Sequence, residues 1–183
     1  MKRILTLISI CLLSACTSMS QDAQIAIYPS VSPSNIGNNI PVFLTVDDTR
    51  SSAVLGSMGE GAQMTTSQDL AATIGVAVVN GLKAKGFDVG SMGNQNSTEV
   101  KVTLEDLSFS KDGNAISTTV GTTSKATVEV ESKGFLRTYS NSEERTIPFS
   151  TNEDSNNSQL SSTLGALVEK MLNDQELLNA LAK

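Results

Sequence analysis

Apolar and polar residues alternate along two neighbouring stretches of the chain, residues 98–109 and 116–130. A period of two is typical of β-strands that bury one face against a core. Asp112-Gly113 lies between the two stretches, and this dipeptide favours a hairpin turn. The pattern therefore predicts two long antiparallel strands, so the fold has to be built around a sheet.

Two further features of this sheet can be read from the sequence. The parity of the apolar residues changes at Glu105 and Asp106, which predicts a β-bulge there. A second hairpin is expected over residues 135–149, with its turn at Asn141-Ser142. If the strand over residues 116–130 forms a sheet edge, its free backbone groups are available to pair with another chain.

The clearest helix lies in the middle of the chain. Aliphatic side chains recur at every fourth position within residues 67–85, a spacing that predicts an amphipathic helix. Thr65 or Ser67 is expected to cap its start, and Gly86 to end it. Its apolar face is expected to belong to the core, because a sheet of this size needs cover on one face.

The remaining elements define the fold class. Residues 160–171 predict a second amphipathic helix, and residues 177–181 a short third one that either packs on the domain or offers an interaction surface. Residues 24–28 and 40–46 read as strands. Strand runs interrupted and followed by helices are typical of α+β folds. We therefore expect one α+β domain over residues 23–183, with an antiparallel sheet, two main helices packed on one face and a short C-terminal helix.

The N-terminus carries the three parts of a secretory signal. Two basic residues precede an apolar run over residues 4–13, and small residues follow before Cys16. The run is too short for a membrane-spanning helix, which needs about 20 apolar residues. Residues 1–15 are therefore predicted to be a signal peptide, and residues 16–22 a lipid-bearing cysteine followed by a short polar tether.

Charge and missing residue types restrict the chemistry of the chain. Removal of the signal peptide lowers the 13 basic side chains to 11, against 19 acidic ones, so the net charge moves from −6 to −8. Such a surface repels nucleic acid, which is not expected as a partner. The chain has no histidine, and Cys11 lies in the signal, so neither imidazole nor a free thiol is offered for catalysis. No catalytic residue, metal or cofactor is predicted.

Leu13-Ser14-Ala15-Cys16 resembles the lipobox of bacterial lipoproteins. The resemblance implies that the Cys16 thiol is joined to a diacylglycerol and that the peptide is cut just before it. The new amine is then acylated, and several acyl chains together hold a protein firmly in a bilayer. Thr17 stands where an aspartate would resemble an inner-membrane retention signal. The resemblance therefore implies the periplasmic face of the outer membrane.

Several segments also resemble, in order and spacing, the YajG family of bacterial lipoproteins. They are the lipobox, "VDDTR", Leu55-Gly56, "LKAKGFDV" and "SSTLGALVEKMLNDQELLNAL". This resemblance covers nearly the whole chain after the signal peptide. It implies a membrane-anchored envelope domain whose biochemical role is not established.

Asp48 and Arg50 are the candidate site residues of the folded part. They lie where the second predicted strand ends. In a structural interpretation, Asp48 binds turn amides and Arg50 forms a bidentate ion pair; in a functional one, both face a ligand together with the Gly-rich segment near Gly59. Asp47 and Asp48 point to opposite faces of a strand, so they are not expected to form a catalytic carboxylate pair.

The lipidation signal and the lack of a recognisable catalytic constellation predict a non-enzymatic binding or scaffolding module of the cell envelope. Its partners would be the membrane, through Cys16, and an envelope protein or cell-wall component. The alternative is a small-ligand binding protein for a cell-wall fragment or a lipid.

Overall fold

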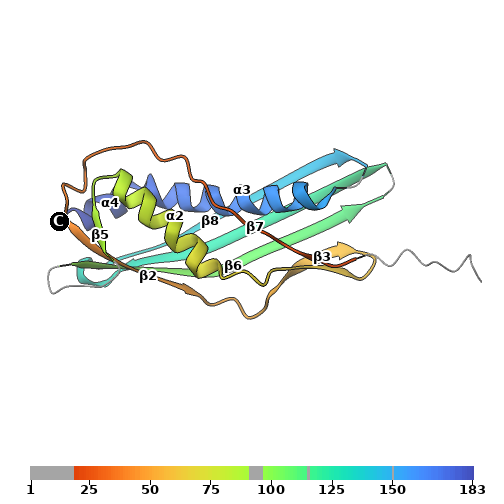
Figure 1. Cartoon of the computed structure of the whole chain (residues 1–183), viewed down its shortest axis with the longest axis horizontal. Coiled ribbons are helices and arrows are strands. Elements are labelled where there is room, and N and C mark those ends of the chain that lie inside the picture. The colour runs from red at the N-terminus through yellow and green to blue at the C-terminus, as the bar shows by residue number, and fades with distance from the viewer. Residues whose placement is uncertain (1–18, 91–96, 115, 150) are drawn as a thin grey trace, which may run out of the picture.

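The alternating residues form one large sheet that carries three helices in the described part of the chain (Figure 1). The structure is a computed structural model, and it describes residues 19–90, 97–114, 116–149 and 151–183. Its elements are β1 (Gln21–Asp22), β2 (Pro41–Asp48), β3 (Val54–Gly59), β4 (Ala62–Thr65), α2 (Leu70–Ala84), β5 (Asp88–Gly90), β6 (Thr98–Gly113), β7 (Ser117–Val130), the 3-10 helix η1 (Glu131–Lys133), β8 (Phe135–Pro148), α3 (Glu153–Leu172) and α4 (Gln175–Leu181). The predicted α+β class is confirmed.

The sheet is mixed, so the prediction of an antiparallel sheet is wrong in part. Its strands lie in the order β1-β4-β3-β6-β2-β5, and β7 pairs with both β6 and β8. β6, β7 and β8 are antiparallel, but β2 runs parallel to β5 and β6, and β3 runs parallel to β6. The physical reason lies in the connection: α2 separates β2 from β5, and a helical crossover returns the chain to the sheet in the same direction.

The predicted β6–β7 hairpin is present, but its turn lies later than predicted, because Asp112 and Gly113 belong to β6 and pair with Thr119 and Thr118. The two strands pair antiparallel, and their register shifts between Leu104 and Asp106, so the predicted bulge is confirmed. β7 lies between β6 and β8 and is therefore not a sheet edge, which removes it as a pairing surface for another chain. Edge positions in this part of the sheet belong to β8.

The predicted second hairpin is wrong, because β8 continues unbroken through Asn141-Ser142 and pairs with β7 along its length. Asn141 lies opposite Ser124 in the ladder, and its side-chain amide donates a 3.4 Å hydrogen bond to the Thr163 carbonyl oxygen of α3. These tertiary contacts override the local turn preference of the dipeptide.

Helix α2 begins later than predicted. Its N-cap is Asp69, whose carboxylate accepts a 2.9 Å hydrogen bond from the backbone N–H of Ala72. The predicted caps are both engaged elsewhere: Thr65 ends β4, and the Ser67 hydroxyl donates to the Asp22 carboxylate at 2.7 Å. The prediction named the wrong capping residue, although a short polar side chain does cap the helix.

The other helix ends agree with their sequence signals. Gly86 follows α2 with a φ of +89°, a conformation that favours glycine. Asn152 caps α3 and accepts a 2.9 Å hydrogen bond from the backbone N–H of Ser155. The leucines of α4 are all buried (Leu177, Leu178 and Leu181). The short C-terminal helix therefore packs on the domain, and its apolar face is not an interaction surface.

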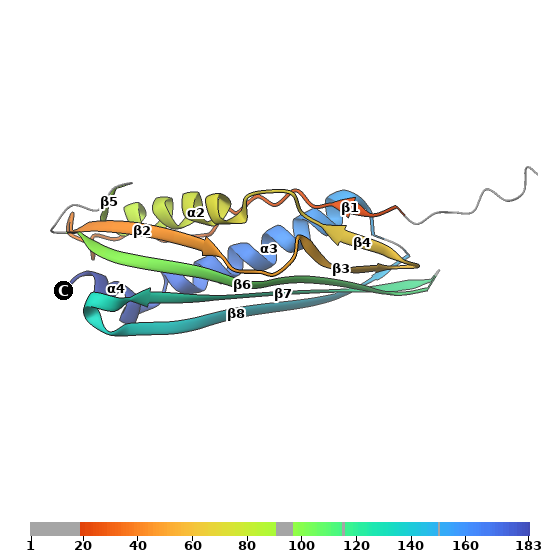
Figure 2. The same ribbon diagram turned by 90° about the horizontal axis from the view of Figure 1, so that it is seen from below.

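The helices and the sheet enclose the core. α2 packs against β2 and β5, and α3 packs against β7 and β8, on the same side of the sheet (Figure 2). The largest fully buried side chains come from both helices and from the strands beneath them: Ile74, Leu82, Leu104, Leu160, Leu164 and Leu167. The apolar periodicity of the two helices thus marks core, as predicted.

An extended segment crosses the outside of the helices, and we call residues 23–31 the strap (Figure 1). Ala23, Ile25 and Ile27 are buried, and the residues between them are exposed. The predicted strand over residues 24–28 is wrong, because this segment joins no ladder and packs on helices. Side chains alternate between two faces in any extended chain, whether or not it pairs with another strand. The sequence therefore indicated correctly that this segment is extended, but it did not show that the segment packs on helices.

Candidate functional site

The predicted lipidation site, Cys16, lies outside the described residues, as do the signal peptide and Thr17. The described chain begins at Met19 and enters β1 at Gln21. β1 pairs in parallel with β4, and the Asp22 carboxylate accepts hydrogen bonds from the backbone N–H and the hydroxyl of Ser67, at 2.8 and 2.7 Å. The fold therefore holds the chain firmly within five residues of Cys16.

Polar side chains of α3 fix the same point. The Gln21 side-chain amide donates to Asn157 Oδ1 at 2.9 Å, and its carbonyl oxygen accepts from Asn156 Nδ2 at 2.9 Å. Gln21 is buried in spite of its polarity, and these bonds satisfy its amide. The start of the domain is therefore bonded both to the sheet and to α3.

Asp48 and Arg50 form a bidentate ion pair at the end of β2. Arg50 Nε and Nη2 donate to the two Asp48 carboxylate oxygens at 2.9 and 2.7 Å, and the Arg50 backbone N–H donates to Asp48 Oδ1 at 3.1 Å. The Arg50 side chain is only 10% exposed. These contacts are the ones that the structural interpretation predicts. Arg50 Nη1, however, is buried and has no hydrogen-bond partner among the described residues.

The neighbouring Asp47 lies on the opposite face of β2. Its carboxylate binds Lys101 Nζ at 2.9 Å, on the side of the sheet away from the helices. The two adjacent aspartates therefore have separate partners, as the alternation of a strand requires.

The Gly-rich segment near Gly59 does not lie beside Arg50. β3 runs from Val54 to Gly59 and turns into β4 through Glu60 and Gly61, which have positive φ angles of 49° and 80°. Gly59 is thus at the far end of β3 from the ion pair. The glycines serve a tight hairpin, and its two strands, β3 and β4, were not predicted from the sequence.

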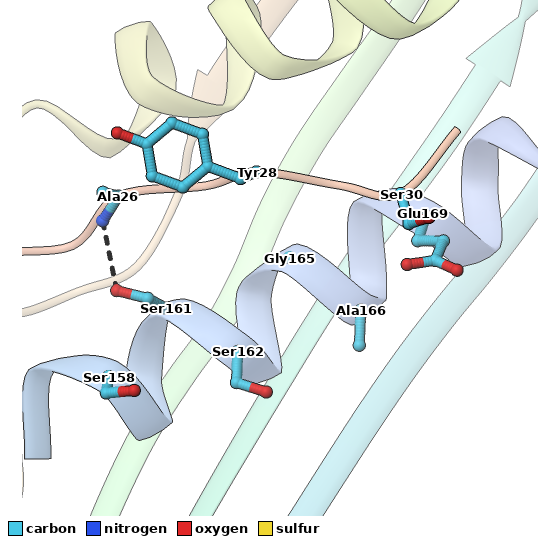
Figure 3. Close-up of a pocket in the computed structure, with 9 residues that line it drawn as sticks. All are labelled: Ala26, Tyr28, Ser30, Ser158, Ser161, Ser162, Gly165, Ala166 and Glu169. Carbon is cyan, nitrogen blue, oxygen red and sulfur yellow. Dashed lines mark hydrogen bonds between the residues drawn. The ribbon is translucent and has the colours of Figure 1, made fainter. Parts of the chain in front are cut away.

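A hydroxyl-rich cavity lies between the strap and α3 (Figure 3). Its volume is about 380 Å³, and its walls are Ala26, Tyr28, Ser30, Ser158, Ser161, Ser162, Gly165, Ala166 and Glu169. The Ser161 hydroxyl accepts a 3.1 Å hydrogen bond from the backbone N–H of Ala26, which binds the strap to the helix. Sequence reasoning missed this cavity, although small residues do recur at helical spacing along that face of α3.

A second and larger hollow lies between α2 and β2. It has a volume of about 630 Å³. Its walls are mainly small or apolar, and they include Leu44, Val46, Ala71, Ala72, Gly75, Val79 and Val89. Gly75 and the alanines leave this space because they carry little or no side chain.

Asp174 joins the last helix to β8. Its carboxylate accepts hydrogen bonds from Arg137 and Tyr139, both at 2.6 Å, and it caps α4 through the backbone N–H of Glu176. Burial acts to raise the pKa of Asp174, but the hydrogen bonds from Tyr139, the Glu176 backbone and Arg137 together hold that pKa below its usual value. Burial and the Asp174 carboxylate raise the pKa of Tyr139. The cluster of Arg137, Tyr139 and Asp174 therefore has a structural role, and each of these side chains is hydrogen-bonded.

No group of three or more histidine, cysteine, aspartate or glutamate side chains in the described ranges is arranged to hold a metal ion. None of the helices described is both long enough and apolar enough to cross a membrane.

Three solved structures are similar to this chain. The structure titled putative neuraminyllactose-binding hemagglutinin homolog from Helicobacter pylori has a TM-score of 0.51 and 9% identity, over 88% of this chain and 97% of that one. An uncharacterized protein has a TM-score of 0.44 and 13% identity, over 81% and 97% of the two chains. A minor lipoprotein from Acinetobacter baumannii has a TM-score of 0.34 and 11% identity, over 79% and 91%.

The comparison of sequences gives the family. No curated protein matches the chain. A family model described as "Uncharacterized lipoprotein" matches residues 29–182, which include the strap after Tyr28, the whole of β2 to β8 and all three helices. The chain therefore belongs to this family, that of the YajG-like uncharacterized bacterial lipoproteins.

Proposed function

We propose that the protein is anchored by lipid at Cys16 to the periplasmic face of the outer membrane and acts there as a non-enzymatic binding or scaffolding module. The observation that carries this proposal is the lipobox, Leu13-Ser14-Ala15-Cys16, in a chain of the lipoprotein family. The short distance in sequence from Cys16 to β1 supports it, because an anchor there would keep the domain at the membrane surface.

The surface of the sheet away from the helices supports a role in binding a partner. It carries hydroxyl groups on the neighbouring strands β7 and β8. The hydroxyl oxygens of Thr119 and Thr146 lie 3.1 Å apart, and those of Thr127 and Thr138 lie 2.9 Å apart. Such hydroxyls both donate and accept hydrogen bonds. This face therefore offers polar contacts to a protein or to the cell wall.

The anchor is tested by replacing each cysteine separately. Cys16→Ala is expected to abolish labelling with radioactive palmitate and to release the protein from sedimented membranes. Cys11→Ala is the matched control, because that residue lies in the signal peptide and should leave labelling intact. Density-gradient separation of the two membranes then tests the outer-membrane assignment. Unchanged labelling of Cys16→Ala would exclude the anchor.

The scaffolding role is tested by placing a photocrosslinking amino acid at Thr119 or Thr146 in cells. We expect crosslinked adducts with an envelope component from both positions. The control position is Lys83, which lies on the helical side of the molecule. If adducts are absent from both threonine positions, or equally frequent at Lys83, the open face of the sheet is not the binding surface.

A second candidate function is binding of a small anionic ligand, such as the carboxylate of a cell-wall peptide, at Arg50. Arg50 Nη1 is buried and has no hydrogen-bond partner within the described part of the chain, which favours this function, because a spare guanidinium donor is able to bind an oxygen atom. A thermal-shift screen with cell-wall fragments tests it. A saturable shift that Arg50→Lys abolishes would support this function, and a flat response would count against it.

A further inference from the structure

The turn between β6 and β7 and the end of β8 place two apolar side chains side by side at one end of the molecule. Ile116 is 77% exposed and Phe149 is 69% exposed. The Phe149 backbone N–H donates a 3.0 Å hydrogen bond to the Ile116 carbonyl oxygen, so the two residues are held together. We call Ile116 and Phe149 the apolar tip.

The apolar tip is rigidly presented. Asn114 Oδ1 accepts hydrogen bonds from the backbone N–H groups of Ile116 and Ser117, at 2.9 and 3.1 Å, and the Asn114 N–H donates to the Ser117 carbonyl oxygen at 2.9 Å. Phe149 has a φ of +64°, a conformation that is unfavourable for a bulky residue. The chain thus keeps an aromatic ring in water on a strained backbone, a combination that is typical of functional positions.

The described chain begins at the same end of the molecule as the apolar tip. The beginning of the described chain, the β3–β4 turn and the β6–β7 turn lie together, opposite the C-terminus (Figures 1 and 2). Four residues lie between Cys16 and Gln21, and five fully extended residue steps span about 17 Å. Met19, which is 84% exposed, adds an apolar side chain to this connection.

From these observations we propose that the apolar tip inserts into the bilayer as a second membrane contact and orients the domain end-on. The inference rests on the lipid anchor proposed above. Two side chains alone bind a membrane weakly, but a short tether makes their insertion intramolecular and raises their effective concentration. Isoleucine and phenylalanine gain from burial in the acyl region, and aromatic rings favour the interface. The net acidic chain makes this contact apolar rather than electrostatic.

The experiment uses fluorescence, because the chain contains no tryptophan. The full-length lipidated protein is reconstituted into phosphatidylethanolamine–phosphatidylcholine vesicles as Ile116→Trp or Phe149→Trp. Leu136→Trp is the matched control, since Leu136 is 68% exposed at the beginning of β8, toward the opposite end of the molecule. Lipids brominated on their acyl chains then quench any indole that enters the bilayer.

We expect the indoles at positions 116 and 149 to emit at shorter wavelength and to be quenched at least about twofold more than the indole at position 136. Equal quenching at the three positions would overturn the proposal. Emission at shorter wavelength without quenching by brominated lipid would also overturn it, because the tip would then be buried in protein, such as a second copy of the chain.

Flotation of the vesicles in a density gradient separates this inference from the anchor on which it rests. Protein that floats but shows no excess quenching at the tip refutes the second contact and leaves the lipid anchor standing. Protein that does not float refutes the anchor, and the second contact falls with it.

Discussion

Asp174 is the carboxylate on which the junction of β8 and α4 depends. Its side chain is 10% exposed, and it receives hydrogen bonds from Arg137, Tyr139 and two backbone N–H groups. The folded state lowers the pKa of Asp174 below 3.8. A lowered carboxyl pKa contributes stability that is fully present above the unfolded pKa and is lost as the pH falls through the folded one.

Asp174→Asn should therefore reduce the free energy of unfolding by about 2 kcal/mol at pH 7, because asparagine keeps the cap but not the charged hydrogen bonds. Between about pH 5 and pH 2, the wild type should lose stability more steeply than the variant. Urea titrations followed by circular dichroism at several pH values measure both effects. Glu176→Gln is the control: this carboxylate also binds Arg137 but is 73% exposed, so little change is expected. Parallel pH curves for wild type and Asp174→Asn would refute the assignment.

At Phe149, in contrast to Asp174, a substitution is expected to stabilise the protein. Its φ of +64° is unfavourable for any residue with a Cβ atom, and its ring is mostly exposed. Phe149→Gly should raise the free energy of unfolding by about 1 kcal/mol, whereas Phe149→Ala should give no such gain because it keeps the Cβ. Chemical denaturation of the two variants in detergent measures the difference. Equal stabilities would mean that the backbone carries no strain at this residue.

Two glycines of α2, Gly75 and Gly81, have different surroundings. A Cβ atom on Gly81 would lie 2.2 Å from Leu172 Cδ1 of α3, and one on Gly75 would lie 3.7 Å from Val46 Cγ2 of β2. Leu172 is fully buried, so it has little room to move. The close approach of α2 and α3 therefore requires glycine at position 81 and not at position 75.

Replacement by alanine should change the free energy of unfolding in opposite directions at the two glycines. Gly81→Ala is expected to lower the free energy of unfolding by about 1–3 kcal/mol through overpacking. Gly75→Ala should raise it by up to about 1 kcal/mol, because alanine favours the helix and the space is open. Thermal denaturation of both variants is the measurement. A stabilised Gly81→Ala variant would show that the helices are not in tight contact there.

The elements that sequence predicted well are those with a strong local signal. α2, α3 and α4 repeat aliphatic side chains at helical spacing, and β6 and β7 alternate apolar and polar residues. β3 and β4 were missed because glycines at positions 56, 59 and 61 are more typical of loops than of strands. Their positive φ angles occur at irregularities of the β3–β4 ladder and in the turn between the two strands. The parallel pairs were missed because strand direction depends on the crossover through α2, which has no local signature.

The strap ties distant parts of the chain into one unit. Its buried isoleucines pack on the helices, and Gln68 and Ser161 accept hydrogen bonds from its backbone at 2.8 and 3.1 Å. Ile25→Ala should cost about 2–4 kcal/mol of unfolding free energy, whereas Tyr28→Ala should cost less than about 0.5 kcal/mol. Ile25 is 3% exposed and Tyr28 is 89% exposed, so the pair forms a matched test by chemical denaturation. Similar small losses in both would show that the strap lies loosely on the domain.

The sequence predicted the contact between Asp48 and Arg50 but not what surrounds it. The ion pair of Asp48 and Arg50 has the bidentate form that its spacing allowed. The separation of that pair from Gly59 followed from β3, an element that was not foreseen. The cavity beneath the strap and the apolar tip arise from segments far apart in the chain, so only the fold brings their residues together.

The parallel pairing of β1 with β4 has a mechanical consequence for a protein held by its first residues. Under the proposed anchor at Cys16, tension on the lipid would load β1 along its length, away from the end of the sheet where the described chain begins. Hydrogen bonds between parallel strands then resist in shear and share the load, instead of opening one after another as they do in a peeled hairpin. Drag on the bilayer would thus be transmitted into β4 through the ladder and into α3 through the Gln21 side chain.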